Sequence, residues 1–357
     1  MTERIPRVGL LAALLLAAAV LPAPAQELPT ATVTAVRESQ PVDRDPDDPA
    51  IWINPADPAK SRVIGTDKDY GLVVFDLDGR IVQRLPDGRL NNVDIRADVA
   101  LGGGTVTLVA ASRRDDNTIA LYTVDKDGVL AHAAPFTFPG SPVEIRYDIY
   151  GIGLYRDPAS GETSVIANFK TGDIVQWVVG GTPEKLELTL ARQFKVETQP
   201  EGVVADDALG LLYVGEEDGG VWRYEADPKA PADGVQVDLV GSACLPADDV
   251  EGLGIYASGE KSGYLVVSAQ GMNRFVLYPR EPDAAGRQTC IGTFHIGTGA
   301  TDPVGETDGI EVISAPLGDR FPRGLMVVQD DRNEGFTRNF KYVSWADVEA
   351  ALKLPTN

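Results

Sequence analysis

Asp48-Pro-Ala-Ile-Trp-Ile53 and Glu251-Gly-Leu-Gly-Ile-Tyr256 are two of six short apolar stretches that each begin at an Asp, Glu or Tyr, after a spacer rich in turn-forming residues. The first residues of these stretches follow one another at intervals of 46 to 57 residues: Asp48, Asp94, Tyr150, Glu201, Glu251 and Asp308. Such intervals are typical of a propeller that builds one four-stranded blade from each unit. Because a blade repeat returns the same position to one central axis, the five carboxylates should lie together. Crowded carboxylates repel one another unless a cation lies among them, so the repeat predicts a metal site as well as a fold.

Two further β-rich segments follow the first one in the units. The second segment is a short, nearly continuous apolar run, as expected for a strand that is covered on both faces. These runs begin at Arg62, Thr107, Ser164, Leu211, Tyr264 and Gly324. The third segment alternates and carries an aromatic residue at or near the same place, as in Val221-Trp-Arg-Tyr224, which suits packing between blades. We therefore predict an all-β fold, a six-bladed β-propeller of four-stranded antiparallel blades.

Closure of the ring requires a strand from one terminus to complete the blade of the other, because an open sheet edge invites aggregation. We expect an N-terminal strand at Ala31–Val36 to pair with the blade around Gly324–Val328. Helix-period patterning occurs at Ser344–Leu352, near the C-terminus. A β-sandwich, or a pair of them, is the alternative architecture.

The N-terminus has the pattern of a secretion signal. A positively charged start precedes an apolar run at residues 10–21, and a small-residue cleavage site ends at Ala25. The apolar run is short for a membrane span. We predict a signal peptide at residues 1–25, a single propeller domain at residues 26–357, and export to the periplasm or the extracellular space.

The chain is acidic, with 53 Asp and Glu against 32 Lys and Arg and a formal net charge of −21. Removal of the signal segment, which carries +1, would leave −21 − (+1) = −22. This balance argues against nucleic acid as a partner, because phosphate backbones need Lys and Arg to neutralise them. We expect a monomer that binds a small molecule and no membrane. Cys244 and Cys290 are the two cysteines, and in an oxidising compartment the sequence leaves open whether they pair.

Charged and amide residues follow the second segments: Lys68, Arg114, Lys170, Glu217 and Gln270. Since antiparallel neighbours bring the end of one strand beside the start of the next, these residues should share one mouth of the channel with the first segments, which also contribute Asp47, Asp48 and Asp249. Clusters of oxygen ligands suit Ca²⁺. Zinc is not expected, because the two histidines of the chain lack metal-ligand spacing. The neighbouring Lys and Arg favour an anion, and phosphate is the natural candidate.

Two long motifs, Asp45-Pro-Asp-Asp-Pro-Ala-Ile-Trp52 and Asn91-Asn-Val-Asp-Ile-Arg96, closely resemble the signatures of the β-propeller phytases, the alkaline calcium-dependent 3-phytase family. Shorter matches continue in order along the chain: Thr66-Asp-Lys68, Ala111-Ser-Arg-Arg114, Glu201-Gly, Glu216-Glu-Asp218, Asp249-Val-Glu251-Gly-Leu, Ser268-Ala-Gln-Gly271, Thr307-Asp-Gly309 and Asn339-Phe-Lys341. The resemblance implies a six-bladed propeller that hydrolyses phytate, or its calcium salt, to lower inositol phosphates and phosphate.

The resemblance also implies roles for individual residues. Several calcium ions would be held at the channel mouth by Asp48, Glu201, Glu217, Asp249, Glu251, Asp302 and Asp308. We add Asp47 and Gln270 to these ligands because of their expected place at the mouth. The phosphate groups of the substrate would be bound by Lys68, Arg114, Tyr150 and Lys170. The same four residues, together with Glu217, are the predicted catalytic residues. A family Lys-Glu pair is Lys170-Thr171 here, so one acidic contact of the second, non-cleaving phosphate site is missing.

The expected reaction is a direct attack of a calcium-bound water on phosphorus, since a bound cation lowers the pKa of water and no covalent nucleophile is evident. Two other functions remain open on the residues alone. A six-bladed lactonase-like hydrolase would hold one central metal with a few Glu, Asp and Asn ligands and would not need three blades of Lys and Arg. A non-catalytic propeller that binds a protein partner would keep all its properties after Lys68→Ala or Arg114→Ala.

Overall fold

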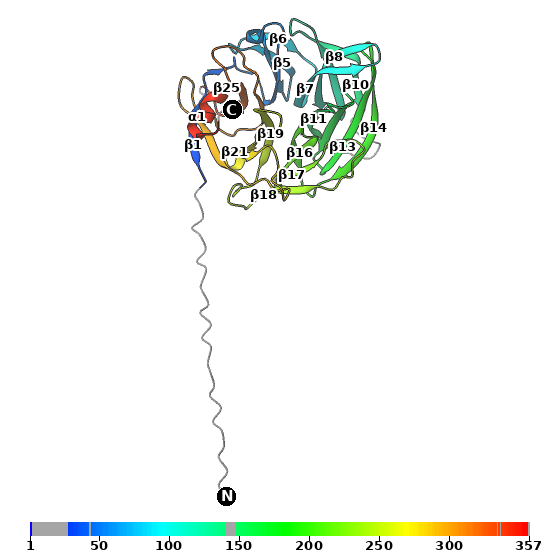
Figure 1. The fold of residues 1–357 in the computed structure, drawn as a ribbon. Coiled ribbons are helices and arrows are strands. Elements are labelled where there is room, and N and C mark those ends of the chain that lie inside the picture. The colour runs from blue at the N-terminus through cyan, green and yellow to red at the C-terminus, as the bar shows by residue number, and fades with distance from the viewer. Residues whose placement is uncertain (2–27, 43, 140–147, 334, 336, 356–357) are drawn as a thin grey trace.

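The computed structural model describes residue 1 and residues 28–42, 44–139, 148–333, 335 and 337–355. In these residues the fold is all-β, with six sheets arranged in a ring around one axis (Figure 1). Five sheets have four antiparallel strands, and the sixth gains an additional parallel strand. This arrangement confirms the six-bladed β-propeller and excludes the β-sandwich. The predicted signal peptide at residues 1–25 lies, apart from residue 1, outside the described residues.

Each blade runs from an inner strand near the axis to an outer strand at the edge, and we number the blades one to six in chain order. The inner strands are β3 (Pro46–Trp52), β7 (Leu90–Leu101), β11 (Ile149–Arg156), β15 (Pro200–Asp206), β19 (Val250–Ala257) and β23 (Ile310–Ile313). The second strands are β4 (Arg62–Asp67), β8 (Gly104–Arg113), β12 (Thr163–Phe169), β16 (Leu211–Glu216), β20 (Gly263–Ala269) and β24 (Leu325–Asp330). The third strands are β5 (Gly71–Asp76), β9 (Thr118–Val124), β13 (Asp173–Thr182), β17 (Gly220–Glu225), β21 (Arg274–Pro279) and β25 (Asn339–Ser344). The outer strands of blades one to five are β6 (Ile81–Leu85), β10 (Leu130–Pro139), β14 (Lys185–Lys195), β18 (Val235–Leu239) and β22 (Gly292–Gly297).

The apolar side chains pack blade against blade. Each of the six hydrophobic clusters in the described part of the chain joins residues of two neighbouring blades. The aromatic residues of the third strands belong to these clusters, as the sequence predicts: Phe75, Tyr122, Trp177, Tyr224 and Tyr278. Because burial of one such side chain contributes about 1.5–3 kcal/mol, these interfaces stabilise the ring without a single central core.

The N-terminal segment closes the ring, but not with the pairing that we expected. β2 (Arg37–Glu38) is the outer strand of blade six, antiparallel to β25. β1 (Thr30–Thr34), which covers most of the predicted Ala31–Val36 strand, instead pairs in parallel with β22 of blade five. The predicted partner was therefore wrong for residues 31–34, because a short alternating strand does not specify which of two adjacent open edges it covers, whereas the backbone N of Val36 donates to the carbonyl of Tyr342 in blade six as expected. The segment joins blades five and six.

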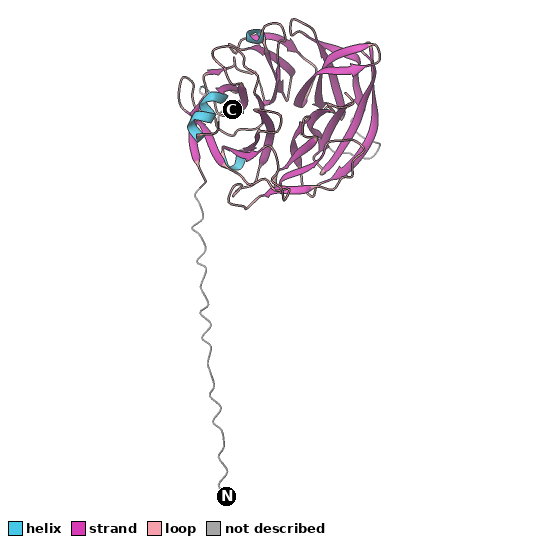
Figure 2. Ribbon diagram, viewed as in Figure 1, coloured by secondary structure: helices cyan, strands magenta, loops and turns pink. Residues whose placement is uncertain are grey.

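Helices are rare in the described residues, as Figure 2 shows. The short turns η1 (Pro58–Lys60) and η2 (Gln270–Met272) are 3₁₀-helical, and α1 (Trp345–Leu352) confirms the predicted C-terminal helix. Helix α1 packs beside β1 and β22 (Figure 1). No helix in residues 28–355, the unplaced positions aside, is long and apolar enough to cross a membrane.

Cys244 and Cys290 form a disulfide, which answers the question that the sequence left open. The bond joins the segment that leads from β18 into β19 to the segment between β21 and β22. It therefore fixes the approach to the inner strand of blade five.

Candidate functional site

Five inner strands begin with the same irregularity. In each of them, three residues of the inner strand oppose two of the second strand directly after the first pair, which is a β-bulge. The residue after the first one of the strand therefore takes an equivalent place in each blade: Asp47, Asn91, Tyr150, Glu201 and Glu251. Asp308, which precedes Gly309 as Glu201 precedes Gly202, stands at the corresponding place before β23. We call these six residues the mouth ring.

The mouth ring corrects the alignment made from the sequence. That alignment placed Asp48 and Asp94 at the repeated position, but Asp47 and Asn91 take it in blades one and two. In blade one two successive aspartates, Asp47 and Asp48, precede the apolar run, and the first of them takes the ring position. In blade two the alignment relied on a negative charge, whereas the residue at the mouth is a neutral amide.

Asp48 and Asp94 point to other partners. Asp48 Oδ2 accepts a hydrogen bond from the backbone N of Val93 at 3.0 Å. Asp94 Oδ1 accepts from Arg96 Nη1 at 2.9 Å, and its Oδ2 accepts from the backbone N of Leu154 at 2.7 Å. Asp94 thus braces neighbouring blades below the mouth and does not join the carboxylates above it.

The channel is narrow below the mouth ring. A cavity of about 20 Å³ is lined by residues of all six inner strands, among them Asp48, Asp94 and Glu311. Burial, reinforced by the charge of Asp94, raises the pKa of Glu311 to about 8. A large anion therefore cannot reach the site along the axis.

Polar side chains of four second strands tie their blades to the mouth of the next blade. In four blades such a side chain donates a hydrogen bond to a backbone carbonyl at the mouth of the following blade. The pairs are Ser112 to Tyr150, Asn168 to Glu201, Ser268 to Thr307 and Gln329 to Pro46. These bonds fix the backbone that carries the mouth ring, so its side chains are held in place relative to one another.

Carboxylates gather on one side of the mouth in two groups. Oxygen atoms of Asp47, Glu201 and Asp308 lie within 4.8 Å of one another, and so do those of Glu201, Glu217 and Glu251. Glu201 belongs to both groups. The prediction that acids from distant blades meet at one mouth is therefore confirmed, with Asp47 in the place that we gave to Asp48.

The environment of these carboxylates disfavours their ionised form. Burial, followed by the charge of Asp308, raises the pKa of Asp47 well above its usual value. Burial and then the charge of Glu201 do the same for Glu251. The pKa of Asp308 rises to about 7 from burial and the charge of Glu201, and burial raises that of Glu217 to about 7. Such a site favours the entry of a cation.

Lys68 lies against the first carboxylate group. Its Nζ is 3.3 Å from Asp47 Oδ2, 3.4 Å from Asp308 Oδ2 and 3.9 Å from Asp45 Oδ2. Burial alone lowers the pKa of Lys68, but the negative charges of Asp47 and Asp308 outweigh it and raise that pKa, so the ammonium group stays charged.

Arg114, Tyr150 and Lys170 form the cationic side of the mouth. Arg114 donates from Nε and Nη2 to Asp148 Oδ2 at 3.1 and 2.8 Å, and from Nη1 to Asn91 Oδ1 at 3.1 Å. The guanidinium carbon lies 5.7 Å and Lys170 Nζ 3.9 Å from the centre of the Tyr150 ring, within the range of cation–π contacts. The aromatic ring therefore holds two cations beside each other without neutralising either.

One residue in each of blades one to five occupies an equivalent position on the rim of the mouth: Lys68, Arg114, Lys170, Glu217 and Gln270. The backbone N of each donates to the carbonyl of the residue that stands two places before the ring residue of the same blade. Cations thus occupy this rim in blades one to three, and Glu217 and Gln270 occupy it in blades four and five. The predicted division of the mouth into a cationic and an acidic side holds for Arg114 and Lys170, whereas Lys68 lies among the carboxylates.

Asp302 is not among the gathered carboxylates. It pairs with the fully buried Lys341, whose ammonium group also contacts Glu38 and lies 2.8 Å from Asn333 Oδ1 and 3.3 Å from Asp330 Oδ2. Asp302 therefore belongs to a separate polar cluster in blade six. Asp249 stays close to the mouth, where burial raises its pKa and its side chain meets that of Glu251.

Four residues at the mouth were missed from the sequence: Asp45, Asn91, Asp148 and Gln199. Asp45, Asp148 and Gln199 could have been found from their spacing, because each stands two places before a ring residue. Their side chains contact Lys68, Arg114 and Glu217, respectively. Asn91 opens one of the two long motifs, so the motif contained the residue but its role could not be read from it.

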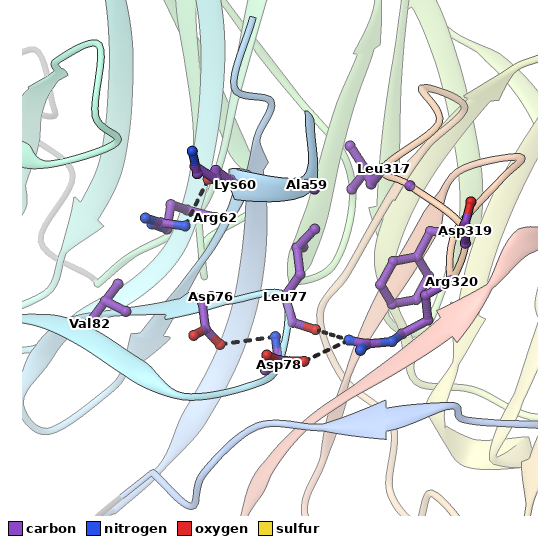
Figure 3. A pocket seen from close by; sticks show the side chains of 12 residues that line it. Ala59, Lys60, Arg62, Asp76, Leu77, Asp78, Val82, Leu317, Asp319 and Arg320 are labelled. Carbon is purple, nitrogen blue, oxygen red and sulfur yellow. Dashed lines mark hydrogen bonds and ion pairs between the residues drawn. The ribbon is translucent and has the colours of Figure 1, made fainter. Parts of the chain in front are cut away.

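A larger cavity lies away from the mouth. It has a volume of about 570 Å³ and is formed by the β3–β4, β5–β6 and β23–β24 connections, at the opposite ends of the strands (Figure 3). Arg320 Nη1 donates to Asp78 Oδ1 and to the carbonyl of Leu77, each at 2.9 Å. Figure 3 shows both contacts as dashed lines. Lys60 and Arg320 are paired with aspartates there, and among the described residues this cavity does not contain a cluster of carboxylates like the two groups at the mouth.

The chain is similar to several known proteins. A family model described as Phytase matches residues 6–355. A 3-phytase of Bacillus subtilis (strain 168) is 37% identical over 332 residues, which cover 90% of this chain and 85% of that protein. Among solved structures, the crystal structure of BBS1N in complex with ARL6DN, soaked with lead, is similar over 79% of this chain and 75% of that chain, with 9% identity and a TM-score of 0.44.

Proposed function

This chain belongs to the phytase family and is an enzyme that hydrolyses phytate, and from that premise we propose that it works with calcium ions held by the carboxylates of the mouth. Phytate is a small molecule that carries many phosphate groups. A chain with a net charge of −21 can hold such a substrate at an acidic mouth when cations lie between the two.

The residues present fit such cations. Asp47 Oδ1, Glu251 Oε2 and Asp308 Oδ1 are buried oxygens without a hydrogen-bond partner among the described residues. An unpartnered buried oxygen is costly, and a cation removes that cost. Because every donor in the two groups is an oxygen, the set suits Ca²⁺ rather than zinc. These unpartnered oxygens, gathered around Glu201, are the observation that carries the proposal.

We assign the calcium ligands by these groups. Asp47, Glu201 and Asp308 would hold one ion, and Glu201, Glu217 and Glu251 a second. Asp48, Asp249 and Gln270 lie next to these groups and could add ligands at the channel and at the rim. An ion held by Asp302 would be a separate one, beside Lys341.

The chemistry divides between the ions and the side chains. Bound calcium would neutralise the carboxylates, hold phosphate oxygens and make a water molecule a better nucleophile toward phosphorus. Lys68, Arg114 and Lys170 would act as fixed cations at the mouth, suited to the charge on the phosphate oxygens. Tyr150 keeps Arg114 and Lys170 apart and in place. Glu217, to which the sequence assigned catalysis, would act by holding an ion.

Phosphate release from phytate, measured on the full protein with calcium and with a chelator, tests the proposal. We expect release to require calcium and to return when calcium is restored. Lys68→Ala and Arg114→Ala should each lower kcat/KM roughly 10²- to 10³-fold, as loss of one fixed donor does. Lys126→Ala, which changes a lysine with an 85% exposed side chain far from the mouth, is the matched control and should have no effect. Full activity of the chelated enzyme would contradict the calcium proposal.

The lactonase-like alternative loses its support from the same geometry. Three blades supply cations to the mouth, which a lactone ring does not need. We further propose that the protein is exported after removal of residues 1–25 and acts as a monomer, without nucleic acid or a membrane as partner. The signal-like N-terminal sequence and the acidic charge support these points.

A further inference from the structure

We propose that Asn91 is a positioning residue that links the orientation of the Arg114 guanidinium to the Glu201 carboxylate shared by both candidate cation groups. The inference rests on the proposed function. Asn91 stands in the mouth ring at the place where the other blades carry carboxylates or Tyr150. Its side chain is fully buried, so its two amide atoms must find partners within the protein.

The amide of Asn91 meets two groups of opposite charge. Its Oδ1 accepts the hydrogen bond from Arg114 Nη1 at 3.1 Å, and its Nδ2 donates to Glu201 Oε1 at 2.7 Å. An amide is suited to this place because one end accepts and the other donates. A carboxylate could serve Arg114 but would repel Glu201, and a lysine would do the reverse.

The guanidinium of Arg114 is thereby held from two sides. Asp148 engages Nε and Nη2, and Asn91 engages Nη1. Of the five N–H groups of an arginine, two then stay without a partner among the described residues, one on each terminal nitrogen. These two N–H groups can donate hydrogen bonds to a phosphate. The bonds of the guanidinium to Asp148 and Asn91 set the direction in which the two groups point.

The consequence is a chain of contacts that runs Asp148, Arg114, Asn91, Glu201 across the mouth. A cation at Glu201 and a phosphate at Arg114 are then joined by one side chain, in addition to their direct attraction. Loss of Asn91 leaves Glu201 in both carboxylate groups and leaves Arg114 on Asp148. We therefore expect calcium binding to persist while the donor that faces the phosphate loses its fixed direction.

The test compares Asn91→Ala, Asn91→Asp and a control in the full-length protein. Asn91→Ala should lower kcat for phytate roughly 10- to 100-fold, the usual effect of losing a group that orients a site residue. KM and the calcium concentration at half-maximal thermal stabilisation should each change less than about 3-fold. Asp116→Asn alters the exposed ion pair of the neighbouring Arg113, at 2.5 Å, and should leave kcat unchanged.

A double-mutant cycle separates positioning from a purely structural role. In an Arg114→Ala background, Asn91→Ala should have little further effect on kcat, because both changes remove the same oriented donor. Fully additive losses would overturn the proposal. So would a loss of calcium affinity as large as that of Glu201→Gln, since Asn91 would then be a ligand.

Asn91→Asp keeps the acceptor for Arg114 and removes the donor to Glu201. It should also lower kcat, and because it retains shape it serves if Asn91→Ala does not fold. Full kcat in Asn91→Asp would overturn the link to Glu201. Failure of the proposed function looks different, because wild-type phosphate release would then be indifferent to calcium whatever Asn91 does.

Discussion

The backbone of Gly151 lies so close to the carbonyl oxygen of Glu201 that a Cβ atom on residue 151 would come within 1.7 Å of it. The same approach recurs one blade farther on, where a Cβ on residue 202 would lie 2.2 Å from the carbonyl oxygen of Glu251. A real Cβ cannot occupy either place without moving the backbone. The glycine after a ring residue therefore lets adjacent inner strands converge, and this convergence brings the ring side chains together.

Gly151→Ala should destabilise the fold and disturb the mouth. Overpacking of a well-packed region costs about 1–3 kcal/mol, and here the obstacle is backbone, which yields less readily than a side chain. Gly180→Ala is the matched control, because Gly180 is also in a strand and an added Cβ there meets nothing within 4 Å. Thermal unfolding of both variants checks this, and equal melting temperatures would contradict it.

The roles of Asp47 and Asp94 can be distinguished by substituting each residue separately. Asp47→Asn removes an oxygen with no hydrogen-bond partner from the first carboxylate group, so calcium affinity should fall roughly 10- to 100-fold and activity with it. Asp94→Asn weakens the contact with Arg96 and should lower stability with little change in the calcium titration. Isothermal titration with calcium decides between them. The reverse pattern would restore the alignment that the sequence suggested.

This contrast shows where the repeat could be read from the sequence and where it could not. The order of the strands, the aromatic residues between blades and the two sides of the mouth followed from pattern and motif. The residues at the ring of blades one and two did not. Asp47 and Asp48 stand side by side before the apolar run of blade one, and the pattern does not say which of them takes the ring position. In blade two the ring residue, Asn91, is neutral, so a repeat of negative charges does not include it.

The N-terminal strand and Asp302 illustrate a different limit. The alternating Thr and Val residues of β1 predicted a strand correctly, but its partner depends on which open edge lies nearest in space. The role of Asp302 was implied by the family resemblance alone. Its pairing with Lys341 depends on a contact across 39 residues, which no local pattern encodes.

Without calcium, stability should fall as pH rises from about 4 to about 7. The folded-state pKa of Asp308 and of Glu217 is about 7, whereas these groups ionise near pH 4 in an unfolded chain. Between those values the folded protein holds protons that the unfolded chain has released, so raising the pH favours unfolding. Calcium binds the ionised groups and should remove this fall. Melting temperatures at pH 5 and pH 7.5, in calcium and in calcium-free buffer, should therefore differ more at the higher pH, and an equal difference would count against the cation sites.

Removal of the disulfide should lower stability but leave the chemistry intact. Cys244 and Cys290 are 46 residues apart, and a cross-link of that span contributes about 2–4 kcal/mol, mainly by restricting the unfolded chain. The variant with both cysteines changed to serine should melt at a lower temperature while keeping its kcat at 25 °C. Treatment of the wild type with a reductant should have the same effect on melting and none on the variant. A variant as stable as the wild type would contradict this account.

Glu201 should couple the two cation groups. Because its carboxylate belongs to both groups, Glu201→Gln should weaken every calcium ion at the mouth. Asp308→Asn and Glu251→Gln each affect one group and should weaken one ion while sparing the other. Calcium titration by calorimetry can resolve this, since the single-group variants should each lose one binding step and Glu201→Gln should lose both. If Glu201→Gln lost only one calcium-binding step, the two groups would bind calcium independently, and the Glu201 carboxylate would serve only one of them.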